Sequence, residues 1–216
     1  MAEMAANEEV HHPLFARLYM AMSKGRRNKG EDEHRRRMLE GLSGKVIEVG
    51  AGNGLNFSLY PAMVEKVLAV EPEPLLREAA LREAQGAPVE IEVVGGVASA
   101  LPAPDETHDA AVASLVLCTV PDQDQALSEL RRVLQPGGEL RFYEHVIANR
   151  RFTRGFQRLS DATYWPHVGG GCHMARDTAA AIERAGFEMK RVERFPFSPS
   201  IIIPSLPHIL GVALRS

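Results

Sequence analysis

Apolar residues near the start of the chain recur at the spacing of an amphipathic helix, which predicts a helix over residues 13–24. Residues 31–42 place acidic side chains before basic ones, the order that the helix dipole favours, and predict a second helix. We expect residues 1–43 to form a helical cap ahead of a larger domain. The apolar residues of the first helix are Leu14, Phe15, Leu18, Tyr19 and Met22.

From residue 45 onward, apolar runs of strand length alternate with stretches of helical spacing. Such alternation is typical of a parallel sheet, whose strands are apolar because helices cover both of its faces. We therefore predict an α/β fold: a doubly wound, mostly parallel seven-stranded sheet that ends in an antiparallel strand. The predicted strands are 45–50, 66–71, 89–96, 109–117, 139–147, 187–195 and 207–215, and the predicted helices are 52–61, 73–85, 122–134, 154–165 and 176–186.

A glycine-rich loop, with Gly50, Gly52 and Gly54, follows the first predicted strand. Glycine allows backbone angles that other residues avoid and lets a ligand approach the main chain. Open parallel sheets bind ligands at the carboxyl ends of their strands. A generic turn between a strand and a helix is the alternative interpretation. The spacing differs from the dinucleotide-binding fingerprint, whose third glycine would fall at Leu55.

Two acidic residues close the first two predicted strands. Glu48 ends an apolar strand, where a carboxylate needs a partner. The ammonium of a methionine moiety would be such a partner, and exposure to solvent is the alternative. Glu71 ends the second strand, where a carboxylate can accept hydrogen bonds from both hydroxyls of a ribose. A cap for the following helix would suit the same position.

The motifs E-V-G-A-G-N-G (48–54), V-L-A-V-E-P (67–72) and L-Q-P-G-G-E-L (134–140) together resemble those of the class I S-adenosylmethionine-dependent methyltransferases. The resemblance, over roughly residues 44–147, implies S-adenosylmethionine as cofactor and S-adenosylhomocysteine as product. It also implies that the glycine loop packs on the methionine part, the acid after strand two holds the ribose, and the loop after strand three holds adenine. The residues that it implies for the cofactor site are Glu48, Gly50, Ala51, Gly52, Gly54, Asn56, Glu71, Pro72, Gly96, Val97, Ala98, Ser114 and Leu115.

Val97 departs from the family pattern, because many members have aspartate there. Without that aspartate, the amino group of adenine loses a hydrogen-bond partner. We expect backbone contacts from Ala98 and packing by Pro72 or Leu101 to hold the ring, so that cofactor binding survives.

Residues 114–120 and 142–146, with Trp165 and Cys172, resemble the branch that contains the mammalian microsomal thiol S-methyltransferases. This resemblance implies a small, apolar acceptor, with thiol sulfur as the favoured nucleophile. Those relatives begin with an apolar membrane anchor, and residues 1–10 show none. Methylation of oxygen, carbon or nitrogen in a phenol, a quinone or a lipid headgroup is the alternative. Two more distant alternatives are a nicotinamide-dependent dehydrogenase and a non-catalytic cofactor-binding protein.

His145 is the candidate catalytic base. It ends the fifth predicted strand, on the same edge of the sheet as the glycine loop. A histidine exchanges its proton near neutral pH, and a thiol has to be deprotonated before it attacks. A purely structural role is the alternative. Glu144 points to the opposite face of the strand and so does not orient His145. The candidate acceptor contacts are Tyr19, Trp165 and Cys172, with Phe152, Phe156 and Tyr164 as further pocket residues or ordinary core.

The methyltransferase domain is expected to span residues 44–216, with acceptor-site elements in 148–175 and 195–208. The N-terminal helices could cover the cofactor as a lid that excludes water, or simply pack on the sheet edge. The Pro-rich apolar stretch 195–210 could roof the acceptor or touch a membrane surface or a second subunit. The basic run 35–37 is expected to be a solvated face, with an anion-binding patch as the alternative.

Composition excludes several classes of protein. A formal net charge of −3 gives no electrostatic footprint for nucleic acid. Two cysteines cannot form a disulfide framework, so a cytoplasmic location is expected. No secretory signal is present, and no apolar run reaches the roughly 18 residues of a membrane span. Cys172 with His167 and His173 lacks a standard zinc spacing, so we expect no metal, and Cys118 is expected to be buried packing.

Overall fold

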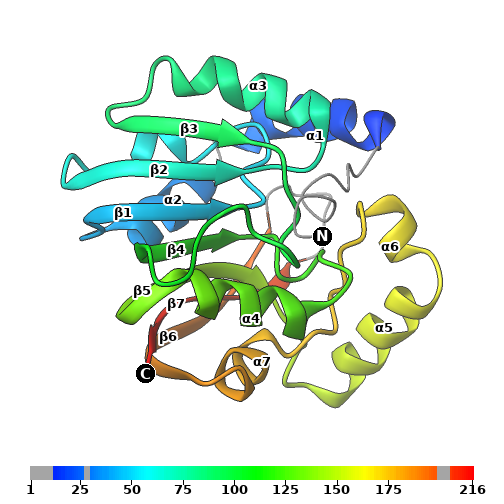
Figure 1. Ribbon diagram of the computed structural model, residues 1–216. Coiled ribbons are helices and arrows are strands. Elements are labelled where there is room, and N and C mark those ends of the chain that lie inside the picture. The colour runs from blue at the N-terminus through cyan, green and yellow to red at the C-terminus, as the bar shows by residue number, and fades with distance from the viewer. Residues whose placement is uncertain (1–11, 27–29, 199–204) are drawn as a thin grey trace.

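The computed structural model describes residues 12–26, 30–198 and 205–216. It confirms the predicted fold class, a seven-stranded sheet in the order β3-β2-β1-β4-β5-β7-β6 (Figure 1). The first five strands are parallel to one another, and β7 runs antiparallel to both β5 and β6. The strands are β1 (Gly44–Val49), β2 (Val64–Val70), β3 (Glu90–Val94), β4 (His108–Ser114), β5 (Leu134–His145), β6 (Phe187–Phe197) and β7 (Leu206–Arg215).

Helices cover both faces of the sheet, and each face has its own apolar cluster. Alternate residues of β1 show why: Val46 packs into the cluster with α2 and α3, whereas Ile47 packs into the cluster with α4 and α7. Helix α1 lies beside α3 (Figure 1). No helix among the described residues is both long and apolar enough to cross a bilayer. The helices are α1 (Pro13–Arg26), α2 (Glu31–Leu39), α3 (Pro74–Ala84), α4 (Gln123–Val133), α5 (Arg151–Ala162), α6 (Trp165–Val168) and α7 (Thr178–Arg184).

The prediction of a helix over residues 52–61 is wrong. The structure has turns there, followed only by the short 3-10 helix η2 (Phe57–Leu59). Gly54 takes φ +78°, and only six residues separate it from Pro61. The left-handed Gly54 and Pro61 thus bound a segment of less than two helical turns, in which few backbone hydrogen bonds could offset the cost of nucleation. The chain therefore leaves the glycine loop in an irregular path.

The fourth strand is also shorter than predicted, because it ends at Ser114 rather than residue 117. Leu115 adopts φ +57°, a left-handed conformation that breaks the strand. Its N–H still donates to the carbonyl of Tyr143 on β5. The chain crosses from β1 to β2 and β3 on one side and returns to β4 on the other, so the glycine loop stands at the switch point of the sheet.

Candidate cofactor and acceptor site

A cavity of about 320 Å³ opens where β1, β2 and β4 end. Its position matches the ligand-binding edge expected of an open parallel sheet. Of the residues that the sequence assigns to the cofactor, those that line the cavity are Gly50, Gly52, Glu71, Pro72, Gly96, Val97, Ala98, Ser114 and Leu115. Ala51, Gly54, Glu48 and Asn56 do not line it.

The backbone of the glycine loop favours glycine. Gly50 and Gly52 take φ +64° and +58°, which other residues adopt only at a cost. Space is a second reason at Gly50, where a Cβ atom would stand 2.3 Å from Cγ2 of Val116; at Gly52 a Cβ would make an ordinary contact, 3.5 Å from the Tyr19 ring. The loop is therefore held in a shape that leaves its backbone open to the cavity.

Hydrogen bonds from the backbone hold the Glu71 carboxylate beside the glycine loop. Its two carboxylate oxygens accept the N–H of Gly52 at 2.7 Å and the N–H of Glu73 at 2.9 Å. Burial raises the pKa of Glu71, although these two N–H donors lower it. Each oxygen keeps a free lone pair, so the carboxylate can also accept the two hydroxyls of a ribose. This donor and acceptor set fits a nucleoside cofactor.

Glu48 faces away from the cavity, contrary to the expectation of a partner in the cofactor. Its oxygens accept hydrogen bonds from Asn56 Nδ2 at 2.8 Å and from the Tyr60 hydroxyl at 2.7 Å. The alternative of a solvated acid is also wrong, because the side chain is buried. Asn56 in turn accepts from Arg35, which contacts Ser114 and Glu31 as well.

Arg35 corrects the expectation that residues 35–37 form a solvated face. Its side chain is buried and donates to Ser114 Oγ at 2.9 Å and to Glu31 Oε1 at 2.8 Å. It therefore ties α2 to the end of β4. The sequence signal for this role was the spacing of Glu31, Arg35, Met38 and Leu42, which places all four on one helix face.

Replacing Glu48 by glutamine should flatten the dependence of stability on pH. Burial raises the pKa of Glu48 to about 7 from its ordinary value of 4.5. The folded state then binds this proton more tightly than the unfolded state, so stability falls as pH rises from about 4.5 to about 7 and levels off above that range. The whole window corresponds to about 3 kcal/mol. Glutamine cannot ionise, so the free energy of unfolding of the variant lacks this decrease.

The measurement for the Glu48→Gln variant is urea unfolding of both proteins at several pH values between 5 and 8. Glu65→Gln is the matched control, because Glu65 is exposed on the adjacent strand β2. A free energy of unfolding that declines equally in wild type and Glu48→Gln would show that Glu48 is ionised in the fold at no cost.

Helix α1 contributes Phe15 and Tyr19 to the cavity wall, and His12 lies just before it. Phe15 also packs on Gly170, where a Cβ would stand 2.2 Å from the ring. Leu18 is exposed, and the side chain of Met22 lies outside the described part of the chain. Tyr19, predicted as an acceptor contact, stands against Gly52 of the cofactor loop.

His145 and Cys172 do not line the cavity, but they meet directly behind it. His145 Nδ1 lies 3.5 Å from Cys172 Sγ and 3.9 Å from Cys118 Sγ. The neighbours of the two cysteines, Gly171 and Thr119, line the cavity. Sequence reasoning treated Cys118 as packing only, because nothing local connects it with His145 and Cys172.

The aromatic residues expected around the acceptor fall in two groups. Trp165 is partly buried at the start of α6 and helps to lower the pKa of the Cys172 thiol, after larger contributions from Cys118 and His145. Phe152, Phe156 and Tyr164 are 92%, 56% and 52% exposed, so neither pocket lining nor core packing describes them. Residues 199–204 of the predicted roof lie outside the described residues.

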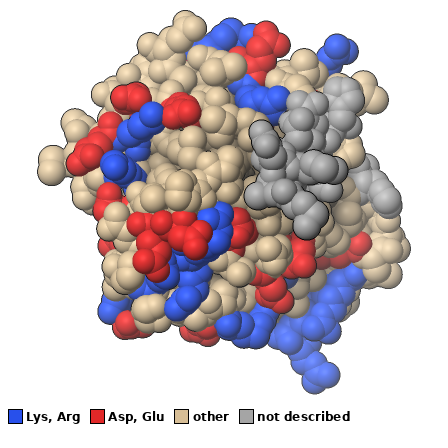
Figure 2. Space-filling view, in the orientation of Figure 1, with Lys and Arg blue, Asp and Glu red and all other residues tan. Residues whose placement is uncertain are grey.

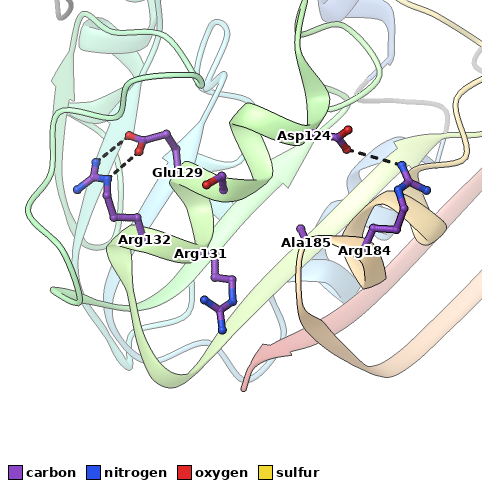
Figure 3. Close-up of a pocket in the computed structure, with 7 residues that line it drawn as sticks. Asp124, Glu129, Arg131, Arg132, Arg184 and Ala185 are labelled. Carbon is purple, nitrogen blue, oxygen red and sulfur yellow. Dashed lines mark hydrogen bonds and ion pairs between the residues drawn. The ribbon is translucent and has the colours of Figure 1, made fainter.

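A second hollow, of about 680 Å³, lies between α4 and α7. Figure 3 shows two ion pairs in it, Arg132 with Glu129 and Arg184 with Asp124. It has no glycine loop and no strand ends. The cavity at the ends of β1, β2 and β4 is therefore the candidate ligand site.

Comparison with known proteins identifies the family. The methyltransferase domain profile matches residues 47–142. Thiol S-methyltransferase TMT1B of Mus musculus is 36% identical over 208 residues, which cover 91% of this chain and 84% of that protein. The chain belongs to the class I S-adenosylmethionine-dependent methyltransferases. This methyltransferase thus takes S-adenosylmethionine rather than a nicotinamide as its cofactor.

Solved structures show the same fold. An S-adenosylmethionine-dependent methyltransferase of Thermotoga maritima superposes with a TM-score of 0.68 at 21% identity, covering 93% of this chain and 95% of that one. Geranyl diphosphate methyltransferase in complex with S-adenosylmethionine gives 0.66 at 14% identity, covering 87% and 85%. The predicted cofactor and reaction type are confirmed.

Proposed function

We propose that this methyltransferase transfers the methyl group to the thiol sulfur of a small, apolar acceptor. The observation that carries the proposal is the charge-free wall of the cavity beyond the glycine loop. That wall is made by Phe15, Val116, Val120, Pro121 and Gly171, with the Thr119 hydroxyl as a polar group. Sulfur hydrogen-bonds weakly and loses little when an apolar wall surrounds it.

The same wall disfavours a lipid headgroup as the methyl acceptor. No lysine or arginine lines the cavity among the described residues, so a phosphate would find no cation there. The two carboxylates of the lining, Glu71 and Glu73, stand at the nucleoside end. The likeness to thiol S-methyltransferase TMT1B supports the same acceptor atom.

Bound S-adenosylmethionine supplies a methyl group already activated on a sulfonium. The protein's part is to align an incoming sulfur with that methyl and to exclude water, and alignment alone can contribute about 7–11 kcal/mol. Phe15 and Tyr19 close the cavity from above the glycine loop. His145 stays a prediction as the base: it lies behind the cavity, in contact with Cys172, whose neighbour Gly171 lines the cavity.

The acceptor is tested with matched sets of compounds that share one carbon skeleton: a thiol, the corresponding alcohol or phenol, and the corresponding amine. We expect S-adenosylhomocysteine and a methylated product from the thiols only. Methylation of the phenol or amine with no reaction of its thiol would overturn the proposal. For His145→Asn, loss of the acidic limb of the pH–rate profile supports a base, whereas a lower rate with an unchanged profile contradicts one.

We also propose a peripheral contact with an anionic lipid surface through α5. Phe152, Phe156 and Leu159 lie on one helix face and are 92%, 56% and 65% exposed, while the buried face carries polar Gln157 and Ser160. Arginines flank the exposed apolar face, and Figure 2 shows basic side chains gathered where Figure 1 places α5. Basic, amphipathic helices with exposed aromatic residues are typical of membrane surfaces.

Replacing both Phe152 and Leu159 by serine should therefore reduce binding to phosphatidylcholine vesicles containing phosphatidylserine by at least about tenfold, since each large apolar side chain contributes about 1.5–3 kcal/mol when buried. Co-sedimentation measures the bound fraction. Leu81→Ser is the control, because Leu81 is 48% exposed on α3. Equal sedimentation of all three proteins, or none by wild type, would refute the contact.

A further inference from the structure

Three side chains with metal-binding atoms converge behind the acceptor end of the cavity. Cys118 follows β4, His145 ends β5, and Cys172 lies in the loop after α6. The two Sγ atoms are 3.7 Å apart, and His145 Nδ1 lies 3.9 Å from Cys118 Sγ and 3.5 Å from Cys172 Sγ. Both cysteines are buried and carry free thiols.

The backbone holds this cluster in place. The N–H of Cys118 donates to the buried carboxylate of Glu144, and its carbonyl accepts the N–H of His173 at 2.8 Å. The latter bond joins the two cysteine segments. The His145 ring packs edge-on against His208, with ring centroids 4.4 Å apart. The three ligand atoms are therefore positioned by the fold and not by chance contacts of mobile side chains.

We propose that Cys118, His145 and Cys172 form a binding site for a thiophilic divalent cation such as Zn²⁺. Zinc binds cysteine sulfur at about 2.3 Å and histidine nitrogen at about 2.0–2.1 Å; tetrahedral geometry then separates two sulfurs by about 3.8 Å and a sulfur from a nitrogen by about 3.5 Å. The three separations in the structure match this triangle. Two sulfurs and one imidazole nitrogen are ligands that zinc prefers.

Local electrostatics agree with the ligand set. The hydrogen bond between the Cys118 and Cys172 thiols, followed by the interaction with His145, lowers the pKa of the Cys172 thiol. The hydrogen bond to Cys172, followed by burial, raises the pKa of the Cys118 thiol. A cation binds cysteine as the thiolate, so protons are released when the metal binds.

The fourth position of the tetrahedron is left to an outside ligand, because no other histidine, cysteine or carboxylate of the described residues joins the cluster. Zinc sites with three protein ligands and one open position are typical of catalysis. Resting on the proposed function, we infer that the acceptor thiol occupies this position and releases its proton to solvent, leaving a cation-bound thiolate as the nucleophile. His145 Nδ1 would then hold the cation, which replaces its role as a base.

The test uses full-length protein purified under reducing conditions and freed of metal with a chelator. Titration with Zn²⁺ against a chromophoric competitor should give one site per chain, and Zn²⁺ should protect both thiols from alkylation, as read by mass spectrometry. Co²⁺ should give a sulfur-to-metal charge-transfer band with the intense visible bands of a tetrahedral site. Absence of stoichiometric binding would overturn the proposal, as would a Cys118–Cys172 disulfide that re-forms under reducing conditions.

Single variants locate the ligands. Cys118→Ser, His145→Asn and Cys172→Ser should each weaken Zn²⁺ binding by more than the roughly 10–100-fold typical of losing an outer residue. His173→Gln is the matched control, and His173 adjoins Cys172 in the sequence. Unchanged affinity in the three variants, or dependence on His173, would refute this ligand set. If a variant does not fold, protection by Zn²⁺ of the two thiols of the wild-type protein from alkylation still tests the site.

The acceptor step is tested separately. Adding a thiol that the enzyme methylates to the Co²⁺-loaded protein should shift the charge-transfer band, whereas its alcohol analogue should not. If Co²⁺ binds and the thiol leaves the spectrum unchanged, the cation is structural and the acceptor inference is wrong. If metal-free enzyme methylates thiols at the full rate, the cation is not required for transfer, while the proposed function itself stands.

Discussion

Replacing Glu71 by glutamine is expected to weaken binding of S-adenosylhomocysteine by about 100-fold, or about 2.7 kcal/mol. Each Glu71 oxygen accepts one backbone N–H, from Gly52 and from Glu73. An amide has one acceptor oxygen, so its NH₂ group must face one of these donors. Hydrogen bonds to charged groups contribute about 1.5–3 kcal/mol each, and the variant loses such a bond to the ribose as well.

Calorimetric titration of the Glu71→Gln variant measures this loss, and thermal unfolding without ligand separates it from misfolding. Glu78→Gln is the matched control, since Glu78 is exposed on α3, where it pairs with Arg82. Binding within about threefold of wild type would mean that Glu71 shapes the loop without touching the nucleoside.

The second large effect is expected at Glu144, which acts on the fold. Its buried carboxylate accepts the backbone N–H groups of Val116, Leu117 and Cys118 at 2.9–3.1 Å. An orphaned buried donor costs about 1–3 kcal/mol, so Glu144→Ala should lower the free energy of unfolding by at least about 3 kcal/mol. Glu144→Gln keeps one acceptor oxygen and should lose less, about 1–3 kcal/mol.

Urea unfolding at one pH orders the Glu144 variants against wild type. Glu188→Gln serves as the control, because Glu188 is exposed on β6 and pairs with Lys190. A loss of less than about 1 kcal/mol in Glu144→Ala would mean that water replaces the carboxylate and that the loop after β4 is held by other contacts.

These two carboxylates divide the work of the site. Glu71 holds the glycine loop, and Glu144 holds the loop after β4 that carries Val116, Cys118 and Thr119. Both carboxylates are buried, and burial raises the pKa of each. Hydrogen bonds from backbone N–H groups oppose this increase. Preorganised loops of this kind reduce the cost of ordering on binding.

The sequence by itself determined the sheet and the edge of the sheet where the cavity opens. Apolar runs, helical periodicity and the glycine triplet act within a few residues of each other, and parallel strands place their carboxyl ends on one edge. Glu71, Gly50 and Gly52 could therefore be assigned from local patterns, and the structure brings them together around one cavity.

Only the tertiary structure decided what pairs with what across the chain. Glu48 meets Asn56 and Tyr60 across the turn that follows the glycine loop, and Arg35 joins them from α2. Cys118, His145 and Cys172 come from three segments whose separation in sequence carries no signal. Such contacts depend on how elements pack and not on local spacing, so a single chain read in order cannot show them.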